Sequence, residues 1–528
     1  MGQLDLRPLP VAGVHGQPIP MRDGTILRAD VHRPDDGERH RTVLVRSPYS
    51  EGSMRSFPVV ACLEAGLAVV LQHCRGRGDS DGEFVPWVHE GPDGADTVAW
   101  ITAQPWSNGE VVASGMSYLA GCALQLATEQ PGALKAIVAT MTPHDFYEGL
   151  NYNGGALAAG SVFHWSALQG MLGALHDARG GDPEAFGRFL KQMALTGESF
   201  SLTEDYPLLD ARVAENFPVW REWVEHPERD AYWEGLAATL RHEVIDVPVL
   251  HTAGWYDIFL KGTLENYKRI PGGRLIIGPW THLGQDSAAG ELYFGAAAAG
   301  RSSGLEQTQV GFLAGRYEGP AVRVFVMGAN VWREEESWPP ARAVPTRFHL
   351  HPDGVLSRDA PATGARPSVF PHDPGDPVPT HGGGLLLPDP LNAGPRDQRE
   401  IERHPGVLCF TTEPLTEDLE VTGELTATLH GTTTASGADW TVKLIDVHPD
   451  GRAMNVADGI LRSPASREAH EVDLVATSQV FLAGHRIRVE VAGSNHPRFD
   501  VHPALEKAEQ TLFHDAGRPS FLTLPVIP

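Results

Sequence analysis

Residues 110–121 read EVVASGMSYLAG, and this stretch is the sharpest local feature of the chain. Its first half is short and apolar, which is typical of a buried strand, and it leads through Gly115 to Ser117. An amphipathic helix is predicted directly afterwards, over 119–130. A strand, a tight turn and a helix in this order form a nucleophile elbow, in which backbone strain keeps a serine hydroxyl exposed. The stretch departs from G-x-S-x-G at one position, where Leu119 stands in place of glycine.

Strands and helices alternate on both sides of this elbow. Short runs rich in β-branched and apolar residues predict strands, and helical spacing of apolar residues predicts a helix. The predicted strands lie at 25–32, 41–49, 66–74, 133–140, 244–257 and 273–282, with a helix at 57–66. Because strands that alternate with helices form a parallel sheet covered on both faces, we expect an α/β core.

Two parts of the chain break this alternation. Between about residues 146 and 241 the pattern is helical with no convincing strand, which is typical of an insertion that caps an active site. Beyond about residue 343, a Pro- and Gly-rich loop at 373–395 precedes several alternating strands, which predict an antiparallel sandwich. The predicted segments are the first part of the core at 1–145, a helical cap at 146–241, the second part of the core at 242–342 and an all-β domain at 343–528.

The overall composition excludes several classes of function. The net charge of -25 argues against binding to nucleic acid or to an anionic membrane surface, since both need concentrated Lys and Arg. No run of about 20 apolar residues and no signal peptide are visible, so we expect a soluble, cytoplasmic protein. The cysteines are scattered, and those at 62, 74 and 122 lie in apolar runs, where buried free thiols are expected.

A serine hydroxyl is a weak nucleophile and needs both a base and a group that orients the base. In a parallel sheet these partners are expected at the carboxyl ends of other strands. VPVLHTAGWYD ends one strand at Asp257, and RLIIGPWTH ends the next at His282. Singly, Asp257 could cap a helix and His282 could bond a loop carbonyl. Together with Ser117, in the chain order of an α/β-hydrolase, they predict a catalytic triad.

Several longer motifs carry a resemblance to a known family. They are MRDGTILRADVHRP, RSPY, RGRGDSDGEF, DGADTVAWITAQPWSNGEV, GMSYLAG, AGWYD, GPWTH and DVHPDGRAMNVADGILR. In these motifs the chain resembles the cocaine esterase-like serine hydrolases, a family that also contains X-prolyl dipeptidyl peptidases and certain β-lactam acylases. The resemblance implies an α/β-hydrolase core with an inserted helical cap, followed by a C-terminal all-β jelly-roll domain.

The resemblance also implies an oxyanion hole. In the family, a tyrosine after a strand ending in Pro-Tyr helps to stabilise the oxyanion, and the RSPY motif places Tyr49 in this role. The second donor is then the backbone N–H of Tyr118, beside the nucleophile. Donors of this kind act on the charge that develops in the tetrahedral intermediate.

The residues after Asp257 bear on the substrate. Family members that hydrolyse α-amino acid esters bind the substrate ammonium with carboxylates, including an acidic pair just after the triad aspartate. Here Ile258 and Phe259 follow, so a cation would be desolvated without a compensating charge. The resemblance therefore implies esters with an apolar or aromatic acyl group. Phe259 and Trp165 are expected to line the pocket, although Trp165 could equally pack inside the cap.

Other functions remain open at this point. The same triad could cleave amide bonds, as an X-prolyl dipeptidyl peptidase or an acylase does. A non-catalytic protein that binds a carbohydrate or a partner protein belongs to another class. We expect a small-molecule substrate, and the two-step serine mechanism requires no cofactor. A metal is not expected, because the histidines at 32, 40, 73, 89, 144 and 164 lack paired ligand spacing such as H-E-x-x-H. A homodimer is also possible.

Overall fold

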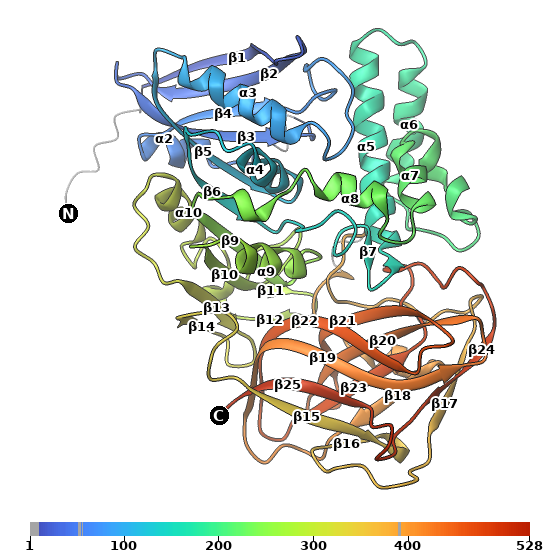
Figure 1. Cartoon of the computed structure of the whole chain (residues 1–528). Coiled ribbons are helices and arrows are strands. Elements are labelled where there is room, and N and C mark those ends of the chain that lie inside the picture. The colour runs from blue at the N-terminus through green and yellow to red at the C-terminus, as the bar shows by residue number, and fades with distance from the viewer. Residues whose placement is uncertain (1–9, 51–53, 55, 389–391) are drawn as a thin grey trace.

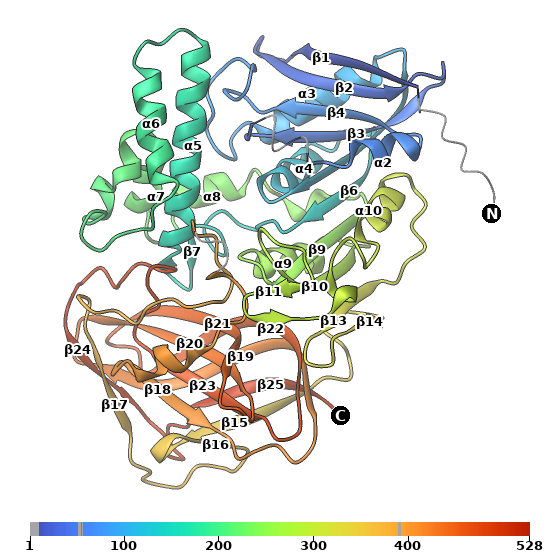
Figure 2. The same ribbon diagram turned by 180° about the vertical axis from the view of Figure 1, so that it is seen from behind.

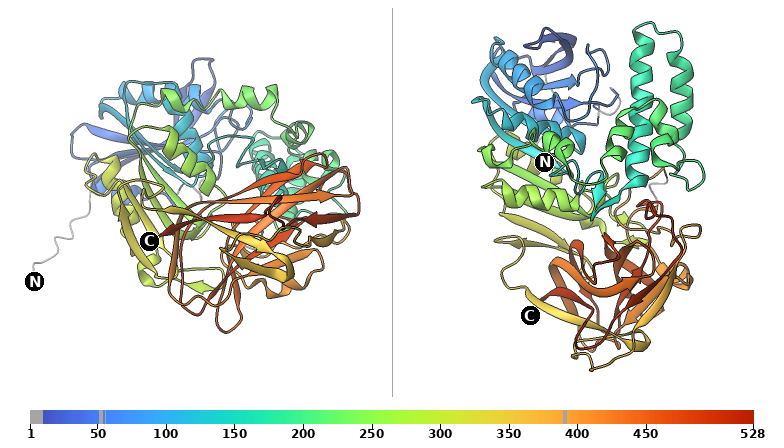
Figure 3. Two further views of the ribbon diagram at one scale, coloured as in Figure 1. Left: turned by 60° about the horizontal axis from the view of Figure 1, so that its bottom comes forward. Right: turned by 45° about the vertical axis from the view of Figure 1, so that its right-hand side comes forward.

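The computed structural model describes residues 10–50, 54, 56–388 and 392–528. The N-terminal stretch 1–9, in which no signal peptide is expected, and residues 389–391 of the predicted loop lie outside the described residues. The chain forms an α/β core, a group of cap helices beside it, and an all-β domain on which both rest (Figure 1). The reverse view in Figure 2 and the two further views in Figure 3 show the same arrangement.

A ten-stranded sheet runs through the core, in the order β1-β2-β4-β3-β5-β6-β9-β10-β13-β14. Neighbours from β4 to β13 are parallel, whereas β1, β2 and β14 are antiparallel to their neighbours. The strands are β1 (Val11–Pro20), β2 (Ile26–Pro34), β3 (His40–Ser47), β4 (Ala68–His73), β5 (Ser107–Met116), β6 (Leu134–Thr140), β9 (Val249–Tyr256), β10 (Arg274–Thr281), β13 (Val322–Val326) and β14 (Val331–Glu335). Every residue of β4 and β9 is buried, as expected for strands with both faces covered.

Helices cover both faces of this sheet. One apolar cluster joins the sheet to α3 and α4, and a second joins it to α2 and α10. The core helices are α2 (Val59–Glu64), α3 (Glu90–Thr102), α4 (Tyr118–Thr128), α9 (Leu260–Arg269) and α10 (Leu305–Leu313). Short elements in the connections are η3 (His242–Val244), η4 (Ala296–Ala298) and the hairpin of β11 (Ala288–Ala289) and β12 (Leu292–Tyr293).

The cap follows β6 and is mainly helical. Its elements are α5 (Ala159–Arg179), α6 (Ala185–Leu195), η1 (Leu208–Asp210), η2 (Arg212–Glu215), α7 (Val219–Glu225) and α8 (Ala231–Ala237). The expectation of no strand in this region is wrong for one hairpin, β7 (Tyr152–Asn153) and β8 (Ala156–Leu157). Gly154 at its turn has φ 53°, and a Cβ there would lie 2.2 Å from the Ile460 carbonyl of the all-β domain. The hairpin therefore depends on contact with the all-β domain. Its strands have only two residues each, which is too short for the alternation of apolar and polar residues that predicts a strand.

The C-terminal domain is the expected jelly roll, with an eleven-stranded sheet system. All of its strand pairs are antiparallel except that between β16 and β18. The strands are β15 (Val344–His351), β16 (Val355–Ser357), β17 (Ser368–His372), β18 (Val407–Thr411), β19 (Leu419–Thr433), β20 (Gly437–Val447), β21 (Ala453–Pro464), β22 (Ala469–Phe481), β23 (Arg486–Ala492), β24 (Ala508–Leu512) and β25 (Phe521–Ile527), with η5 (Pro352–Gly354) and η7 (Gln398–Arg403) between them. One apolar cluster runs from β9 and β10 of the core into this domain.

The observed fold confirms the expected class, an α/β-hydrolase core with a helical cap and a C-terminal jelly roll. Backbone hydrogen bonds join the core to the jelly roll, since Met327 N–H donates to the Ser478 carbonyl and Val480 N–H donates to that of Met327. In the described part of the chain, no helix is long and apolar enough to cross a membrane.

Candidate active site

Ser117 occupies the turn between β5 and α4 with φ 61° and ψ −126°, a conformation that L residues rarely adopt. The turn is possible because Gly115 has no side chain: a Cβ there would lie 2.3 Å from the carbonyl carbon of Leu119. Leu119 itself lies within the first turn of α4. Leu119, which replaces the last glycine of G-x-S-x-G, therefore has an ordinary helical backbone conformation, and glycine is not needed at this position.

The predicted triad residues come together at the carboxyl ends of their strands. His282 Nδ1 lies 2.6 Å from Asp257 Oδ1, and His282 Nε2 lies 3.1 Å from Ser117 Oγ. Asp257 follows β9 and His282 follows β10, which are parallel neighbours in the sheet. Asp257 and His282 are both buried, while Ser117 is partly exposed. This geometry suits an imidazole that accepts the serine proton and is held in one orientation by the carboxylate.

Tyr49 lies beside the nucleophile, as the family resemblance implies. Its hydroxyl accepts a hydrogen bond of 3.0 Å from Trp165 Nε1–H of α5 and also interacts with the Ser117 side chain. Burial raises the pKa of Tyr49 to about 12, so the phenol keeps its proton at neutral pH and can donate it to an anion. The Tyr118 N–H belongs to the first turn of α4, where backbone N–H groups have no acceptor within the helix.

Buried polar groups surround the Tyr118 side chain, next to Ser117 in the chain, and the sequence patterns did not reveal them. The Tyr118 hydroxyl donates to Glu90 Oε1 at 2.5 Å and accepts from the Trp87 N–H at 3.0 Å. Burial raises the pKa of Glu90, and burial next to this carboxyl raises the pKa of Tyr118. The pair holds the side chain of Tyr118, the first residue of α4, whose backbone N–H is the expected second oxyanion donor. No local motif marks Glu90, because its role depends on a contact with a residue 28 positions away.

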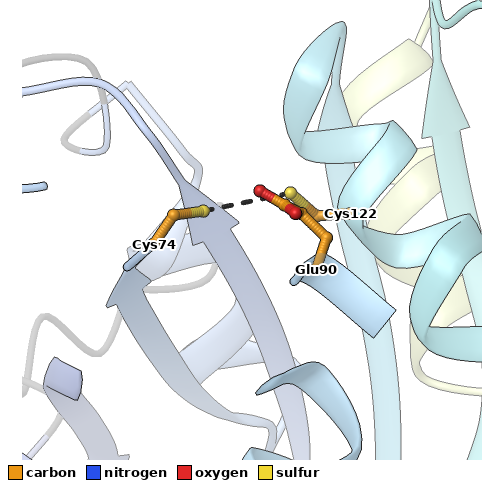
Figure 4. A group of neighbouring side chains, drawn as sticks. All are labelled: Cys74, Glu90 and Cys122. Atoms are coloured by element: carbon orange, nitrogen blue, oxygen red, sulfur yellow. Dashed lines mark hydrogen bonds between the residues drawn. The ribbon is translucent and has the colours of Figure 1, made fainter. Parts of the chain in front are cut away.

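Two thiols lie beside these polar groups, and Figure 4 shows them facing each other next to Glu90. The Sγ atoms of Cys74 and Cys122 are 4.0 Å apart. Burial raises the pKa of Cys122 well above its usual value, which keeps the thiol protonated and unreactive. Cys62, Cys74 and Cys122 are buried free thiols, as the sequence predicts.

Ser117 lies in the wall of a pocket that residues from all three parts of the fold line. Its aromatic wall consists of Trp87, Trp165, Trp223, Phe259 and Phe499. The other lining residues are Ser117, Tyr118, Pro143, Gly149, Leu150, Asn151, Asn153, Ala158, Ser161, Val162, Ile258, Gly384, Leu386 and Arg498. Among these described lining residues the charged side chain is that of Arg498, which pairs with Asp458.

Both predicted pocket residues lie in this wall. The Phe259 ring meets the His282 ring edge-on at 5.3 Å, and Trp165 stacks on Tyr118 at 5.9 Å. Trp165 also stacks on Trp223 at 6.0 Å, so it packs within the cap as well as lining the pocket. The sequence patterns did not single out Trp87, Trp223 or Phe499, whose positions depend on packing between distant segments. The one feature of the sequence that indicates an aromatic pocket wall is its content of 12 tryptophans.

Known proteins share this organisation. Family models match residues 23–284, as X-Pro dipeptidyl-peptidase (S15 family), and residues 317–523, as X-Pro dipeptidyl-peptidase C-terminal non-catalytic domain. The chain is 34% identical to cocaine esterase of Rhodococcus sp. (strain MB1 Bresler), over 96% of this chain and 97% of that protein.

Two solved structures share the fold. One is an aminopeptidase from a Thaumarchaeota archaeon, with a TM-score of 0.82, 24% identity, and coverage of 100% of this chain and 99% of that one. The other is an α-amino acid ester hydrolase, with a TM-score of 0.80, 24% identity, and coverage of 98% and 96%. The sequence match to cocaine esterase extends over nearly the whole of both chains, and the same core, cap and jelly roll are present here. The chain therefore belongs to the cocaine esterase-like family of serine hydrolases.

Proposed function

We propose that this protein hydrolyses carboxylic esters with an apolar or aromatic acyl group, using Ser117, His282 and Asp257 and an acyl-enzyme intermediate. The observation that carries the proposal is the continuous hydrogen-bonded chain from Asp257 through His282 to Ser117 at the wall of an apolar pocket. The name of the cocaine esterase to which this chain is similar also indicates ester hydrolysis.

In the acylation step, Ser117 Oγ attacks the ester carbonyl while its proton moves to His282 Nε2. The carbonyl oxygen becomes an oxyanion that accepts hydrogen bonds from the Tyr49 hydroxyl and the Tyr118 N–H. As the tetrahedral intermediate collapses, the ester C–O bond breaks and the imidazolium gives its proton to the leaving alcohol. Asp257, 2.6 Å from His282 Nδ1, stabilises the imidazolium without taking a proton itself.

In the deacylation step, water takes the place of the alcohol. His282 Nε2 removes one proton from the water as the water oxygen attacks the acyl carbon. When the tetrahedral intermediate collapses, the bond between the acyl carbon and Ser117 Oγ breaks, and the imidazolium gives this proton to Oγ. The products are a carboxylic acid and free enzyme. Water is the only reactant besides the ester, and no redox group takes part.

The preference for an apolar acyl group rests on the pocket wall. Phe259 and Trp165 present ring surfaces near His282 and Tyr118, and Ile258 adds an aliphatic side chain. A dipeptidyl peptidase or an amino acid ester hydrolase must bind a free ammonium group. The described lining residues include no carboxylate, so an ammonium there would be desolvated without a partner.

A short ester series tests the proposal. Initial rates and alcohol burst are measured with p-nitrophenyl and benzoyl esters, and with a Gly-Pro anilide, for the wild type and Ser117→Ala. We expect aromatic esters to be turned over and the variant to lose at least about 10⁴-fold in kcat. A fluorophosphonate probe is expected to label the wild type at Ser117.

The matched control is Ser114→Ala, in the same strand and buried, three residues before the nucleophile. Any loss of activity in this control variant measures the effect of disturbing β5 without removing the Ser117 hydroxyl. Retained turnover in folded Ser117→Ala would contradict the nucleophile assignment. Cleavage of the anilide in preference to all esters would instead favour the peptidase or acylase reaction, and a folded wild type that the probe fails to label would favour a non-catalytic binding protein.

A further inference from the structure

A cluster of three side chains lies at one end of the jelly roll, far from the triad in the sequence. Asp446 is near the end of β20, His448 is in the turn that leads to β21, and His485 is in the turn between β22 and β23. His485 Nδ1 lies 2.7 Å from Asp446 Oδ1, and His448 Nε2 lies 3.8 Å from Asp446 Oδ2. The two imidazole rings have centroids 4.5 Å apart. Nothing in the proposed hydrolysis uses these groups.

The spacing of these atoms fits a small metal ion. One ligand atom from each of the three side chains lies within 4.8 Å of the others. In a tetrahedral zinc site with bonds of about 2.0–2.1 Å, ligand atoms are separated by roughly 3.3–3.4 Å. The observed separations of 2.7 and 3.8 Å end on different oxygens of Asp446, so rotation of side chains is needed to direct one oxygen and both imidazole nitrogens at a common ion.

The surroundings also favour a cation. The Asp446 carboxylate is buried, and a buried charge is stable only when it is paired, hydrogen-bonded or bound to a metal. Gln479 Nε2 donates to Asp446 Oδ2 at 3.3 Å and holds the carboxylate in place. The His448 side chain is 18% exposed, which leaves one side open for entry and for a water ligand.

A second cluster of ligand-type side chains provides a contrast. Cys74, Glu90 and Cys122 in Figure 4 are fully buried, and the Arg46 guanidinium binds the Glu90 carbonyl next to them. Glu90 already accepts a hydrogen bond from the Tyr118 hydroxyl, and a dication beside a buried guanidinium would be repelled.

At the jelly-roll cluster the nearby cation is Arg452, which has Nη2 3.5 Å from His448 Nδ1. Its charge is offset by Asp450, because Arg452 Nε donates to that carboxylate at 2.8 Å. The jelly-roll cluster is therefore the better cation site of the two.

We propose that Asp446, His448 and His485 bind a divalent transition-metal ion of the Zn²⁺ class, with water as the fourth ligand. Two imidazoles and one carboxylate are ligands that zinc accepts readily. The ion links the β20–β21 turn to the β22–β23 turn. Gln479, which holds Asp446, also bridges to Met327 of the hydrolase core, so the site supports the contact between the two domains.

The test uses the full-length protein after dialysis against EDTA. Zinc is added at one equivalent, free metal is removed by gel filtration, and retained zinc is measured by ICP-MS for the wild type, Asp446→Asn and His448→Gln. His351→Gln is the matched control, because His351 is in the same domain and bonds Ser357 at 3.0 Å instead of a carboxylate. Absorption of the Co²⁺-loaded protein reports the ligand geometry independently of stability.

We expect the wild type and His351→Gln to retain one zinc per chain with a tetrahedral Co²⁺ spectrum. Losing a ligand should weaken zinc binding by about 100-fold or more. Zinc should raise the wild-type Tm by roughly 2–4 °C and leave that of Asp446→Asn unchanged. Release of zinc by the wild type during filtration would overturn the proposal. So would equal retention by folded Asp446→Asn, since it would place the metal elsewhere.

Discussion

The molecule contains two buried Asp–His pairs of nearly equal length in different surroundings. Asp257 and His282 approach to 2.6 Å in the core, and Asp446 and His485 approach to 2.7 Å in the jelly roll. In the core pair, the other imidazole nitrogen faces Ser117 Oγ at 3.1 Å. In the jelly-roll pair, a second imidazole lies against the first. The hydrogen-bonded pair alone therefore does not specify a chemistry; the third group and the access of substrate do.

The difference arises from the strands that carry each pair. Parallel neighbours β9 and β10 place Asp257 and His282 at one edge of the sheet, where the elbow after β5 also ends. That edge opens into the pocket between core, cap and jelly roll. Asp446 near the end of β20 and His485 in the β22–β23 turn belong to an antiparallel sheet, which brings the two side chains together but provides no strained nucleophile.

Asp257→Asn is expected to have the largest effect on hydrolysis. The amide preserves shape but favours the wrong tautomer of His282, so we expect kcat to fall about 10⁴-fold. Stopped-flow acylation with a p-nitrophenyl ester measures this loss. The parallel substitution Asp446→Asn sharpens the comparison, because its expected effect is on zinc retention. Losses of similar size in both variants would mean that the two pairs are functionally linked.

Tyr49→Phe is expected to have the next largest effect. It removes one of the two proposed oxyanion donors and leaves the triad in place, so kcat should fall about 10²–10³-fold with little change in KM. Single-turnover and steady-state kinetics on one ester separate the two constants. An unchanged kcat would assign the oxyanion to donors other than Tyr49.

Trp165→Phe should have a smaller effect. The indole N–H that donates to Tyr49 at 3.0 Å is lost, while an aromatic wall is kept. A neutral hydrogen bond contributes about 1 kcal/mol, so we expect kcat to fall roughly 5- to 10-fold. A Trp165→Phe/Tyr49→Phe double variant should lose little more than Tyr49→Phe alone. Fully additive losses would show that Trp165 acts independently of Tyr49.

The smallest expected effect concerns pH. Burial raises the pKa of Tyr49 to about 12, so its phenol is neutral below that pH and loses its donor only as pH rises through about 12. The ratio of wild-type kcat/KM to that of Tyr49→Phe should therefore stay constant between about pH 7 and pH 10. Taking this ratio removes the pH dependence of kcat/KM that the two proteins share. A ratio that falls toward one near pH 10 would contradict the raised pKa.

The class of the fold and the candidate catalytic residues of the core could both be predicted from the sequence alone. The strand, turn and helix pattern around Ser117, and polar residues at the ends of two later strands, predict positions that parallel strands must bring together. The identities of Ser117, Asp257 and His282 could be read because each lies at the end of a local, periodic element. Family motifs added Tyr49, which no local pattern distinguishes.

The groups that surround these residues could be identified only from the tertiary structure. Glu90 beside Tyr118, the Trp87, Trp223 and Phe499 wall, and the jelly-roll cluster of Asp446, His448 and His485 each join segments far apart in the chain. Local periodicity records which face of an element is buried, but not which distant element covers it. Contacts between distant segments depend on how all the layers pack at once, and for that physical reason pockets and ligand clusters emerge only from the folded molecule.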